Sequence, residues 1–425
     1  MMRIGLEVHV ALPTKTKLFC SCSTSAKEPN TSICPICMGF PGSKPMLNKN
    51  ALAIALSISN ALKCEMPKQI SFVRKVYFYP DLPKSYQITQ LQRPAGVNGS
   101  VFYNKGKVGI RRVQIEEDPA KIIREEEYTL VDFNRSGIPL VEIVTEPDIT
   151  DEESLRDFIS ELKSILYYLG VDVEGEFKAD LNISLAEQRV EIKNVTGTKN
   201  LIDATRYEIE RQTSVINSGQ KVKPETRSYN AEKMITESSR EKESDEEYGY
   251  IFEPDLTEYD TDGINLEKPT YASVMAAEYS SKYNVDGTLI KSLIMFDKNA
   301  LAKLEYAKDK HNMKTVINAV ELLSRYKKDF SNEKFEELLK TIEMGAYIDS
   351  TVMNKIEIGE KIDINKGVRI EDIDALLNSI LSGMKKEEYR DNKKVFNFIV
   401  GKVVKEKKAN PKLVAERLKA IIDKV

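Results

Sequence analysis

Alternating apolar and polar residues in the first half of the chain predict β-strands with one buried face. Glu7 and His9 share the polar face of a strand predicted over residues 2–11, and its other face carries Ile4, Leu6, Val8 and Val10. The strand after Gly109 alternates in the same way, and the alternation puts Glu116 on its polar face.

One carboxylate interrupts an apolar run. Glu142 lies within Pro139–Val144, whose apolar neighbours predict a strand covered on both faces. An ionised glutamate at such a position is costly unless another group compensates its charge. Two interpretations stay open: a structural ion pair with an Arg or Lys, or a site shared with the other acidic strands.

Helical periodicity is clearest after residue 150, and this helix is expected to be scaffold. Thr150 and Glu153 have the spacing of a capping box, and Gly170 supplies a stop. The apolar stripe of this helix consists of Leu155, Phe158, Ile159, Leu162, Ile165, Leu166 and Leu169.

Shorter patterns predict further elements. Helices are expected over 48–62 and 201–217. Two antiparallel strands are expected over 177–184 and 189–194, and they carry Asp180, Asn182, Lys193 and Asn194. The segment 225–250 is highly charged and poor in apolar residues, so it is predicted to be a long excursion that becomes ordered only on a partner.

The last third of the chain is predicted to be helical. A small bundle is expected over 269–330, with His311 exposed in a charged segment, followed by a separate helical tail over 331–425. In the last helix Asn410 and Pro411 take the N-cap and first-turn positions, and the stripe is Val414, Leu418, Ile421, Ile422 and Val425. The whole pattern predicts an α+β fold: a large domain with a mixed or antiparallel sheet, then a small helical domain and an all-α tail.

Length and composition favour a multi-domain protein. A chain of 425 residues with 41% hydrophobic residues is long enough for two or three cores. No apolar run reaches about eighteen residues, so no membrane span is expected. The first strand begins directly after the N-terminus, which leaves no room for a signal or transit sequence. A cytoplasmic protein without a membrane partner is predicted.

A net charge of -3 hides oppositely charged segments. Residues 1–115 carry 16 Lys plus Arg against 4 Asp plus Glu, whereas residues 116–170 carry 5 against 15. Residues 385–425 are basic again, with 13 against 6. Basic segments suit polyanions, and an acidic neighbour can hold a metal. The alternatives are that the first two segments neutralise each other, and that the tail is a solvated lysine-rich surface.

Four of the five cysteines form two close pairs, and the pairs are Cys20, Cys22, Cys34 and Cys37. Two such pairs separated by a short loop in a cytosolic protein are typical of a structural zinc site, with an iron–sulfur cluster as the minor alternative. Disulfides are disfavoured in that compartment. Cys64 stands alone in a predicted apolar helix, where a buried, small hydrophobic residue is expected.

The acidic residues of the three predicted strands suggest one site. Glu7, His9, Glu116 and Glu142 would form a mostly oxygen-ligand site suited to Mg or Mn rather than to tetrahedral zinc. The sequence contains no GxxxxGK[ST] and no GxGxxG, so a nucleotide would bind without a P-loop. The segment 71–88 combines cations, tyrosines and a proline-bounded turn, as surfaces that meet phosphates or bases do, although such strands are also common in sheet cores.

Several motifs resemble one family, in order, along the whole chain. They are GLEVHV from Gly5, the two cysteine pairs, RKVYFYPDLPKSYQI from Arg74, IEEDPAK from Ile115, VDFNRSGIPLVEIVTEPD from Val131 and ANPKLV from Ala409. They are similar to motifs of GatB, one of the subunits of the aminoacyl-tRNA amidotransferases. The tail resembles the helical module of YqeY-type proteins. The related protein GatE carries a synthetase-like insertion for which this chain has no room.

The resemblance implies domains and a reaction. The domains are a cradle (1–268) with a zinc knuckle at 20–37, a helical domain (269–330) and a tRNA-binding tail (331–425). In the reaction, ATP phosphorylates the side-chain carboxylate of Glu on tRNA(Gln), or of Asp on tRNA(Asn), and ammonia converts the acyl phosphate into the amide. A separate amidase subunit supplies the ammonia from glutamine through a channel, and a small third subunit completes a heterotrimer.

The resemblance also implies roles for single residues. The positions around Mg match Glu7, His9, Glu116 and Glu142, with Glu117 as the substitute for Glu116. The substrate, nucleotide or channel positions match Arg74, Lys75, Tyr79, Lys84, Asn134 and Arg135, and Lys75 is also placed to help pass ammonia. The structural zinc positions match Cys20, Cys22, Cys34 and Cys37.

The chain also departs from the family pattern. Val76 and Ser85 stand where the family usually has Asn and Gly, Lys178 stands where an Arg is usual, and the helical domain is short. Two other function classes stay open. One is a non-catalytic, zinc-containing tRNA-binding or assembly protein, and the other is an ATP-dependent ligase that joins ammonia to a small-molecule acid.

Overall fold

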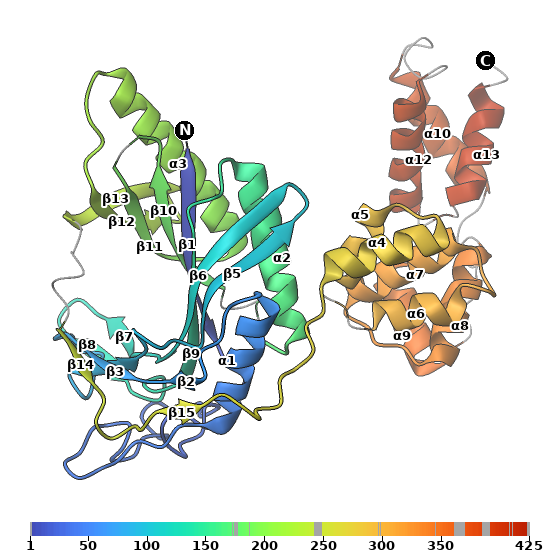
Figure 1. Cartoon of the computed structure of the whole chain (residues 1–425). Helices are drawn as coiled ribbons and strands as arrows, with labels where there is room; N and C mark the ends of the chain where they lie inside the picture. The colour runs from blue at the N-terminus through green and yellow to red at the C-terminus, as the bar shows by residue number, and fades with distance from the viewer. Residues whose placement is uncertain are drawn as a thin grey trace. The chain divides into compact units, whose positions relative to one another are not determined.

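The computed structural model describes residues 2–171, 173, 177–186, 188–241, 249–295, 297, 299–344, 346–360, 370–384, 392–407, 409 and 411–422. The chain divides into two compact units, Met1–Met275 and Ala276–Val425. The first unit contains every described strand, and the second is helical (Figure 1). The predicted α+β class is confirmed.

The first unit is organised on an eight-stranded mixed sheet with the strand order β13-β12-β11-β10-β1-β9-β6-β5 (Figure 1). Only the β11–β12 pair is parallel. The strands are β1 (Arg3–Ala11), β5 (Gly96–Tyr103), β6 (Gly106–Glu117), β9 (Pro139–Thr145), β10 (Lys178–Ser184), β11 (Val190–Thr196), β12 (Glu225–Asn230) and β13 (Ile235–Glu241). The first strand of the chain therefore lies inside the sheet, between strands that come much later in sequence.

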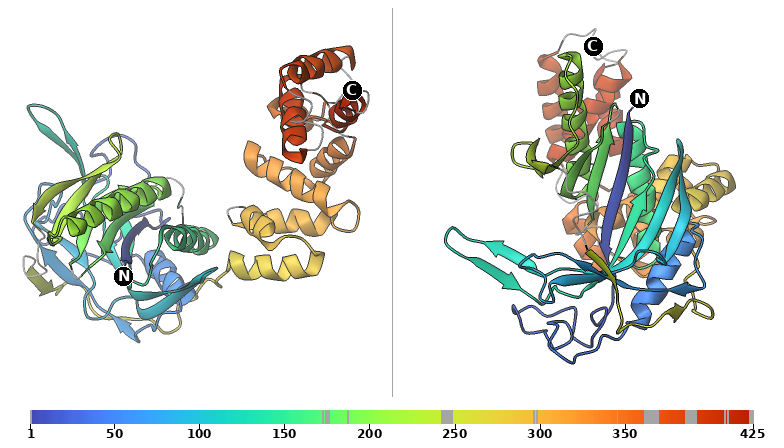
Figure 2. Two further views of the ribbon diagram at one scale, coloured as in Figure 1. Left: turned by 90° about the horizontal axis from the view of Figure 1, so that it is seen from above. Right: turned by 60° about the vertical axis from the view of Figure 1, so that its left-hand side comes forward.

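The two faces of this sheet differ as the alternation predicts. Ile4, Leu6 and Val8 are buried in one core together with residues of three helices, α1 (Lys49–Ala61), α2 (Glu152–Tyr168) and α3 (Thr198–Asn217) (Figure 2). The opposite face, which carries Glu7 and His9, is called the acidic face below.

A second, three-stranded sheet borders the acidic face. It has the order β14-β3-β4 and consists of Gly249–Phe252, Val73–Val76 and Tyr86–Thr89. Residues of both sheets line the same cavities. Two smaller pairs complete the unit: β2 (Gln69–Ile70) with β15 (Tyr259–Asp260), and the hairpin of β7 (Lys121–Arg124) and β8 (Thr129–Asp132), which extends away from the sheet (Figure 2).

The helices of the first unit follow their predicted stripes, with corrections at the ends. The stripe of α2 is buried throughout, and Gly170 follows its end with φ +82°. The predicted cap is wrong, because Asp151 rather than Thr150 accepts the hydrogen bond from Ser154 N, at 2.8 Å. Helix α1 is capped by Asn48, within the predicted range. Cys64 follows the end of α1 instead of lying in it, and its half-buried sulfur leaves no room for a side chain at Gly99.

The prediction that 225–250 is an excursion is wrong for its described part, because β12 and β13 extend the main sheet. A buried polar network holds this hairpin. Arg227 donates to Thr236 Oγ1 at 2.8 Å and to the Thr236 carbonyl at 2.6 Å. Glu208 of α3 is fully buried and accepts from Arg211 at 2.6 Å and from Thr236 Oγ1 at 3.0 Å. Buried ion pairs and hydrogen bonds thus stabilise this hairpin in place of the apolar stripe that its sequence lacks. Residues 242–248 lie outside the described part of the chain.

The second unit consists of short helices. They are α4 (Ala272–Tyr283), which begins in the first unit, α5 (Gly287–Ile294), α6 (Ala300–Ala307), α7 (Met313–Tyr326), α8 (Asn332–Glu343), α9 (Ser350–Ile358), α10 (Ile370–Ser382), α12 (Lys393–Lys407) and α13 (Pro411–Ile422). The last three form a core of their own. Pro411 opens α13 as predicted, whereas Asn410 and Val425 lie outside the described residues. The boundaries near 268 and 330 stay predictions.

His311 is not exposed, contrary to the prediction. It lies in the loop between α6 and α7 with a side chain that is 7% exposed, between two glutamates of α8. Its Nδ1 is 2.8 Å from Glu343 and its Nε2 is 3.0 Å from Glu336. Both ring nitrogens can donate only when the imidazole is protonated. Burial lowers the pKa of His311, but the hydrogen bonds and charges of the two glutamates outweigh burial and raise it.

We expect this contact to make the second unit sensitive to pH. A raised pKa in the folded state means that the stabilisation is complete below the unfolded value of about 6.5 and is lost as pH rises through the folded value. Calorimetry of the full chain between pH 6 and 9 should show the melting temperature of the second unit falling, and His311→Gln should flatten this slope. An unchanged slope in the variant would refute the role of His311.

A second prediction concerns the network under β12 and β13. Arg227→Met removes one partner of a buried polar network and should lower the free energy of unfolding of the first unit by about 3 kcal/mol, with faster hydrogen exchange at 225–241. Lys233→Met is the matched control, because Lys233 forms an exposed pair with Glu237 in the same hairpin and should cost less than about 0.5 kcal/mol. Equal effects of the two variants on urea unfolding would contradict the assignment.

Candidate active site

Strand register brings distant polar residues together on the acidic face. His9 of β1 lies opposite Glu142 of β9, and Glu142 lies opposite Gln114 of β6. On the other side of β1, Glu7 lies opposite Asp180 of β10. Residues that face each other across antiparallel strands project to the same side of the sheet. The polar row therefore crosses four neighbouring strands.

His9 lies at the centre of this row. Its Nε2 is 3.4 Å from Glu142 Oε2. The same atom is 3.7 Å from Glu116 Oε1 and 3.8 Å from Glu7 Oε1. Ligand atoms of Glu7, His9 and Glu142 all lie within 4.8 Å of one another, close enough to share one metal ion. We call these four residues the acidic cluster, and the structure brings together every residue that the sequence assigned to it.

Burial and mutual repulsion set the charges of the acidic cluster. Burial and the charge of Glu142 raise the pKa of Glu7 to about 8 and that of Glu116 to about 7. Burial would raise the pKa of Glu142 too, but its hydrogen bond to His9 and the charge of His9 lower it to about 2. The same contact outweighs burial and raises the pKa of His9 to about 10. Three carboxylates this close need cations, which a divalent metal can supply.

The ion-pair interpretation of Glu142 holds only in part. Arg112 NH2 is 3.5 Å from Glu142 Oε1, at the outer limit of a hydrogen bond. The shorter contact of Glu142 is with His9. Glu142 therefore has an arginine partner and also lies among the other acidic strands, and its role in a shared site stays a prediction.

A cavity of about 220 Å³ opens onto the acidic cluster. We call it the acidic cavity. Besides the cluster, charged residues line it, and they are Lys75, Asp118, Arg135, Lys178, Asp180 and Lys193. The sequence assigned Lys75 and Arg135 to a site but not the other four. Asp118, Asp180 and Lys178 lie on or beside predicted acidic strands, and this position is the sequence signal that could have identified them as site residues. Only the strand register shows that they face the cavity.

Glu117 points away from the acidic cluster. Its Oε1 accepts from Lys84 Nζ at 2.5 Å and from Ile88 N at 2.9 Å. Strand alternation puts Glu116 and Glu117 on opposite faces, so Glu117 does not substitute for Glu116. It lines a second cavity of about 340 Å³ together with Lys84 and Arg74. These two predicted site residues are therefore separated from the acidic cluster.

The remaining residues of the 74–88 region are held in several ways. Arg74 donates to Glu253 at 2.7 and 2.8 Å and lies over the ring of Tyr86. Tyr79 is 43% exposed, and its hydroxyl accepts from Arg124 at 2.9 Å. Ser85 has φ +60°, in the left-handed region that favours glycine.

The Asn-Arg-Ser-Gly turn connects two parts of the unit. Asn134 Oδ1 accepts from Ser32 N at 2.8 Å, and its Nδ2 donates to the Glu28 carbonyl at 2.6 Å. Arg135 forms a bidentate pair with Asp118, at 2.5 and 2.7 Å. Asn134 thus ties the turn to the cysteine-bearing loop, whereas Arg135 reaches the acidic cavity.

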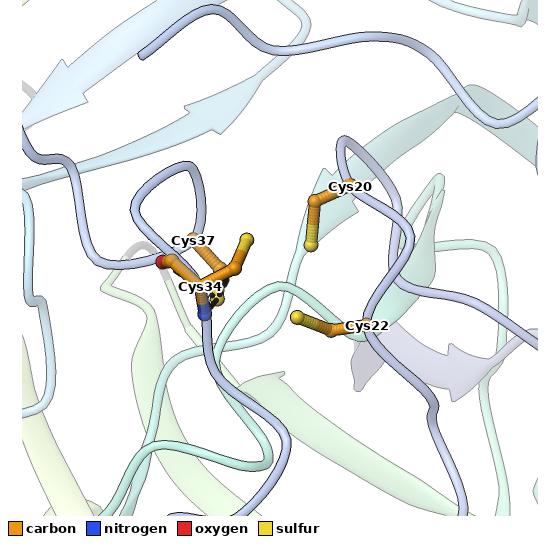
Figure 3. A group of neighbouring side chains, drawn as sticks. All are labelled: Cys20, Cys22, Cys34 and Cys37. Carbon is orange, nitrogen blue, oxygen red and sulfur yellow. Dashed lines mark hydrogen bonds between the residues drawn. The ribbon is translucent and has the colours of Figure 1, made fainter.

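The four predicted cysteines meet in space. Their sulfur atoms all lie within 4.8 Å of one another, and no disulfide joins them. Figure 3 shows Cys20 and Cys22 on one loop pointing toward Cys34 and Cys37 on another. Four thiolates at this separation suit a tetrahedral ion such as zinc. We call these residues the cysteine cluster; it can bind a metal ion.

A fully buried lysine lies against the cysteine cluster. Lys17 Nζ is 3.7 Å from Cys37 Sγ and donates to the Phe133 carbonyl at 3.0 Å. Hydrogen bonding from Cys20 lowers the pKa of Cys37 to about 4 against the effect of burial, with further contributions from the Cys34 amide and Lys17. Four thiolates around a divalent ion leave two negative charges, and Lys17 compensates part of them.

Comparisons with known proteins identify the relatives of this chain. A family model described as the GatB/GatE catalytic domain matches residues 2–265. Proteins named as the GatB subunit of aspartyl/glutamyl-tRNA(Asn/Gln) amidotransferase are similar over nearly the full length. The one from Sulfurisphaera tokodaii is 38% identical, covering 99% of each chain, and the one from Methanocaldococcus jannaschii is 34% identical, covering 100% of this chain and 98% of its own. The first alignment spans 474 positions, so the relative carries insertions that this chain lacks.

No described helix is long and apolar enough to cross a lipid bilayer.

Lys17→Met should weaken metal binding at the cysteine cluster. Removing a group that supports metal ligands typically costs about 10–100-fold in affinity. Competition with a chromophoric chelator, using zinc as the probe, should show this loss in the full chain. Lys303→Met is the control, because Lys303 is also buried but bonds to the Phe330 carbonyl in the second unit. Equal zinc affinity in wild type and Lys17→Met would remove Lys17 from this role.

Proposed function

The chain belongs to the GatB/GatE family, and we propose on this premise that it is the GatB subunit of an aspartyl/glutamyl-tRNA amidotransferase. The enzyme is a carbon–nitrogen ligase of protein biosynthesis. Its substrates are Glu-tRNA(Gln), Asp-tRNA(Asn) or both, and its products are Gln-tRNA(Gln) and Asn-tRNA(Asn). The nitrogen comes from glutamine through a separate amidase subunit, and a small third subunit completes a cytoplasmic heterotrimer.

The observation that carries this proposal is the convergence of Glu7, His9, Glu116 and Glu142 in one cavity bordered by cations. Transfer of a phosphoryl group depends mainly on positioning and on neutralising charge. The donor set is rich in oxygen, as Mg or Mn prefers. Such an ion would be held by these four residues and would supply charge neutralisation for the terminal phosphate of ATP.

The charged residues around the acidic cavity have complementary tasks. Lys75 of β3 and Lys178 and Lys193 of the main sheet face the cavity and can neutralise phosphate oxygens. The side-chain carboxylate of the tRNA-bound amino acid attacks the terminal phosphorus, and ADP leaves. Ammonia then attacks the acyl carbon, and inorganic phosphate leaves. Lys178 keeps the charge of the arginine usual in the family but not its bidentate geometry.

The ammonia route is assigned to the second cavity. Tyr86, Ile88 and Glu117 line it, whereas their neighbours Gln87 and Glu116 line the acidic cavity. The two cavities therefore lie on opposite faces of the same strand ends. Lys84, paired with Glu117, lines the second cavity, and ammonia that enters near Arg74 would pass this pair.

The other parts of the chain serve structure and tRNA binding. The cysteine cluster holds a structural zinc ion. The first domain (1–268) is the catalytic cradle, the second (269–330) is a helical domain, and the tail (331–425) grips tRNA through its basic surface. The convergence of the acidic cluster speaks against a protein that only binds or assembles tRNA complexes.

The proposal is tested by co-expressing the chain with the amidase and the small third protein from the same genome. Amidation of Glu-tRNA and Asp-tRNA is then measured with ATP and either glutamine or ammonia. Amide that forms only with ATP and this chain supports the proposal and identifies the substrate. Bound tRNA without amide from either nitrogen source would favour the non-catalytic alternative, and amidation of free acids without tRNA would favour a small-molecule ligase.

Glu142→Gln should lower ammonia-dependent amidation at least about a hundredfold, because it removes a carboxylate that would hold the ion neutralising the transferred phosphate. Binding of tRNA should survive. Glu146→Gln is the matched control, because Glu146 follows the end of the same strand but is 40% exposed and pairs with Arg111. The amidation activity of this variant should stay near that of the wild type. Wild-type turnover in Glu142→Gln would eliminate the metal-binding role.

A further inference from the structure

A third hollow, which we call the arginine hollow, lies beside the acidic cluster. It measures about 320 Å³, and Arg3, Arg111, Arg112 and Arg189 line it. A smaller space of about 140 Å³ shares Glu7, Arg112 and Arg189 with it and reaches Glu142. The arginine hollow is therefore continuous with the carboxylates of the acidic cluster.

Most of the positive charge in this hollow lacks a counter-charge. Arg111 is neutralised by Glu146, at 3.1 and 2.9 Å. Arg3 and Arg189 form no ion pair with any residue that the structure describes. Arg112 has the 3.5 Å contact with Glu142, so among the described residues one guanidinium has a weak ion-pair partner and two have none.

Buried polar atoms in the hollow are also unsatisfied. Arg112 Nε and Asn182 Oδ1 are buried without a hydrogen-bond partner among the described residues. Leaving such buried atoms unpaired is costly, because they have lost their hydrogen bonds to water. The amide of Asn182 can present either its oxygen or its NH2 group to a ligand. An oxyanion can accept from Arg112 Nε, and it can accept from Asn182 once the amide is turned so that its NH2 group takes the place of Oδ1.

We propose that Arg112, Arg189 and Asn182 form a phosphate-binding subsite beside the acidic cluster. Guanidinium groups match the oxygen geometry of phosphate and donate two parallel hydrogen bonds to it. Arg112 lines both the hollow and the smaller space that reaches Glu142, so a phosphate bound here would lie next to the acidic cluster. The phosphate comes from the polyphosphate of a nucleotide or from the backbone at the tRNA acceptor end.

The binding of phosphate is inferred from the hollow alone, and only the identity of the phosphate rests on the proposed function. The first test therefore needs no catalysis. Inorganic tripolyphosphate is titrated calorimetrically into the full chain. Arg189→Gln and Arg112→Gln should each weaken binding about tenfold or more, as the loss of a charge-assisted hydrogen bond does, and Arg189→Lys should retain part of it.

Arg206→Gln is the control, because Arg206 is exposed and pairs with Glu152 on the helical side of the unit. Thermal melts identify any variant that fails to fold; Arg189 is exposed, so its variants are expected to fold. No binding of tripolyphosphate by wild type would overturn the proposal. Equal weakening in Arg206→Gln and Arg189→Gln would overturn it as well, because diffuse surface charge would then explain the binding.

The second test identifies the source of the phosphate in the assembled amidotransferase. A raised KM for ATP in Arg189→Gln assigns the subsite to the nucleotide, whereas a raised KM for aminoacyl-tRNA assigns it to the acceptor end. Unchanged KM values with unchanged kcat would overturn the inference. If the wild-type complex forms no amide but tripolyphosphate binding still depends on Arg189, the proposed function fails while the subsite stands.

Discussion

The contact between His9 and Glu142 across neighbouring strands is the interaction on which the acidic face depends. Three carboxylates converge there from β1, β6 and β9, and like charges at this distance repel strongly in a buried environment. His9 is the only cation within the cluster itself, and the contact keeps it charged. Lysines of neighbouring strands neutralise further negative charge of the cluster: Lys75 comes from the small sheet and Lys193 from β11. The arrangement of two sheets around one face follows from this need for positive charge.

Local patterns were sufficient to predict most elements of the first unit. Alternation identified β1, β6 and β9 and the faces of Glu7 and Glu116, and the stripe identified α2, because these signals depend on a few adjacent residues. The register that puts His9 opposite Glu142 joins residues far apart in sequence, and no local pattern contains it. The hairpin at 225–241 was missed for another reason: ion pairs of Arg227 and Glu208 stabilise it, and charged sequence without apolar periodicity predicts disorder.

The cysteine cluster is connected to the acidic cavity by direct contacts. Lys17 joins Cys37 to the Phe133 carbonyl, and Asn134 joins the same turn to the cysteine-bearing loop. The next residue, Arg135, holds Asp118 at the wall of the acidic cavity. The sequence suggests that the cysteine cluster is purely structural. Through these contacts it also helps to position Arg135, one of the cations of the candidate active site. Sequence spacing identified the four cysteines but could not show this connection, because a buried lysine has no pattern of its own.

The position of β1 has a consequence for how the protein is made. Its two neighbours in the sheet are Pro139–Thr145 and Lys178–Ser184, so one edge of β1 stays unpaired until residue 145 has been synthesised and the other until residue 184. Pairing over such distances is slow because the intervening chain must close a long loop. During this interval an apolar strand with an open edge can pair with other nascent chains. The centre of the sheet is therefore the part of the first unit whose strands stay open to wrong pairing for longest during synthesis.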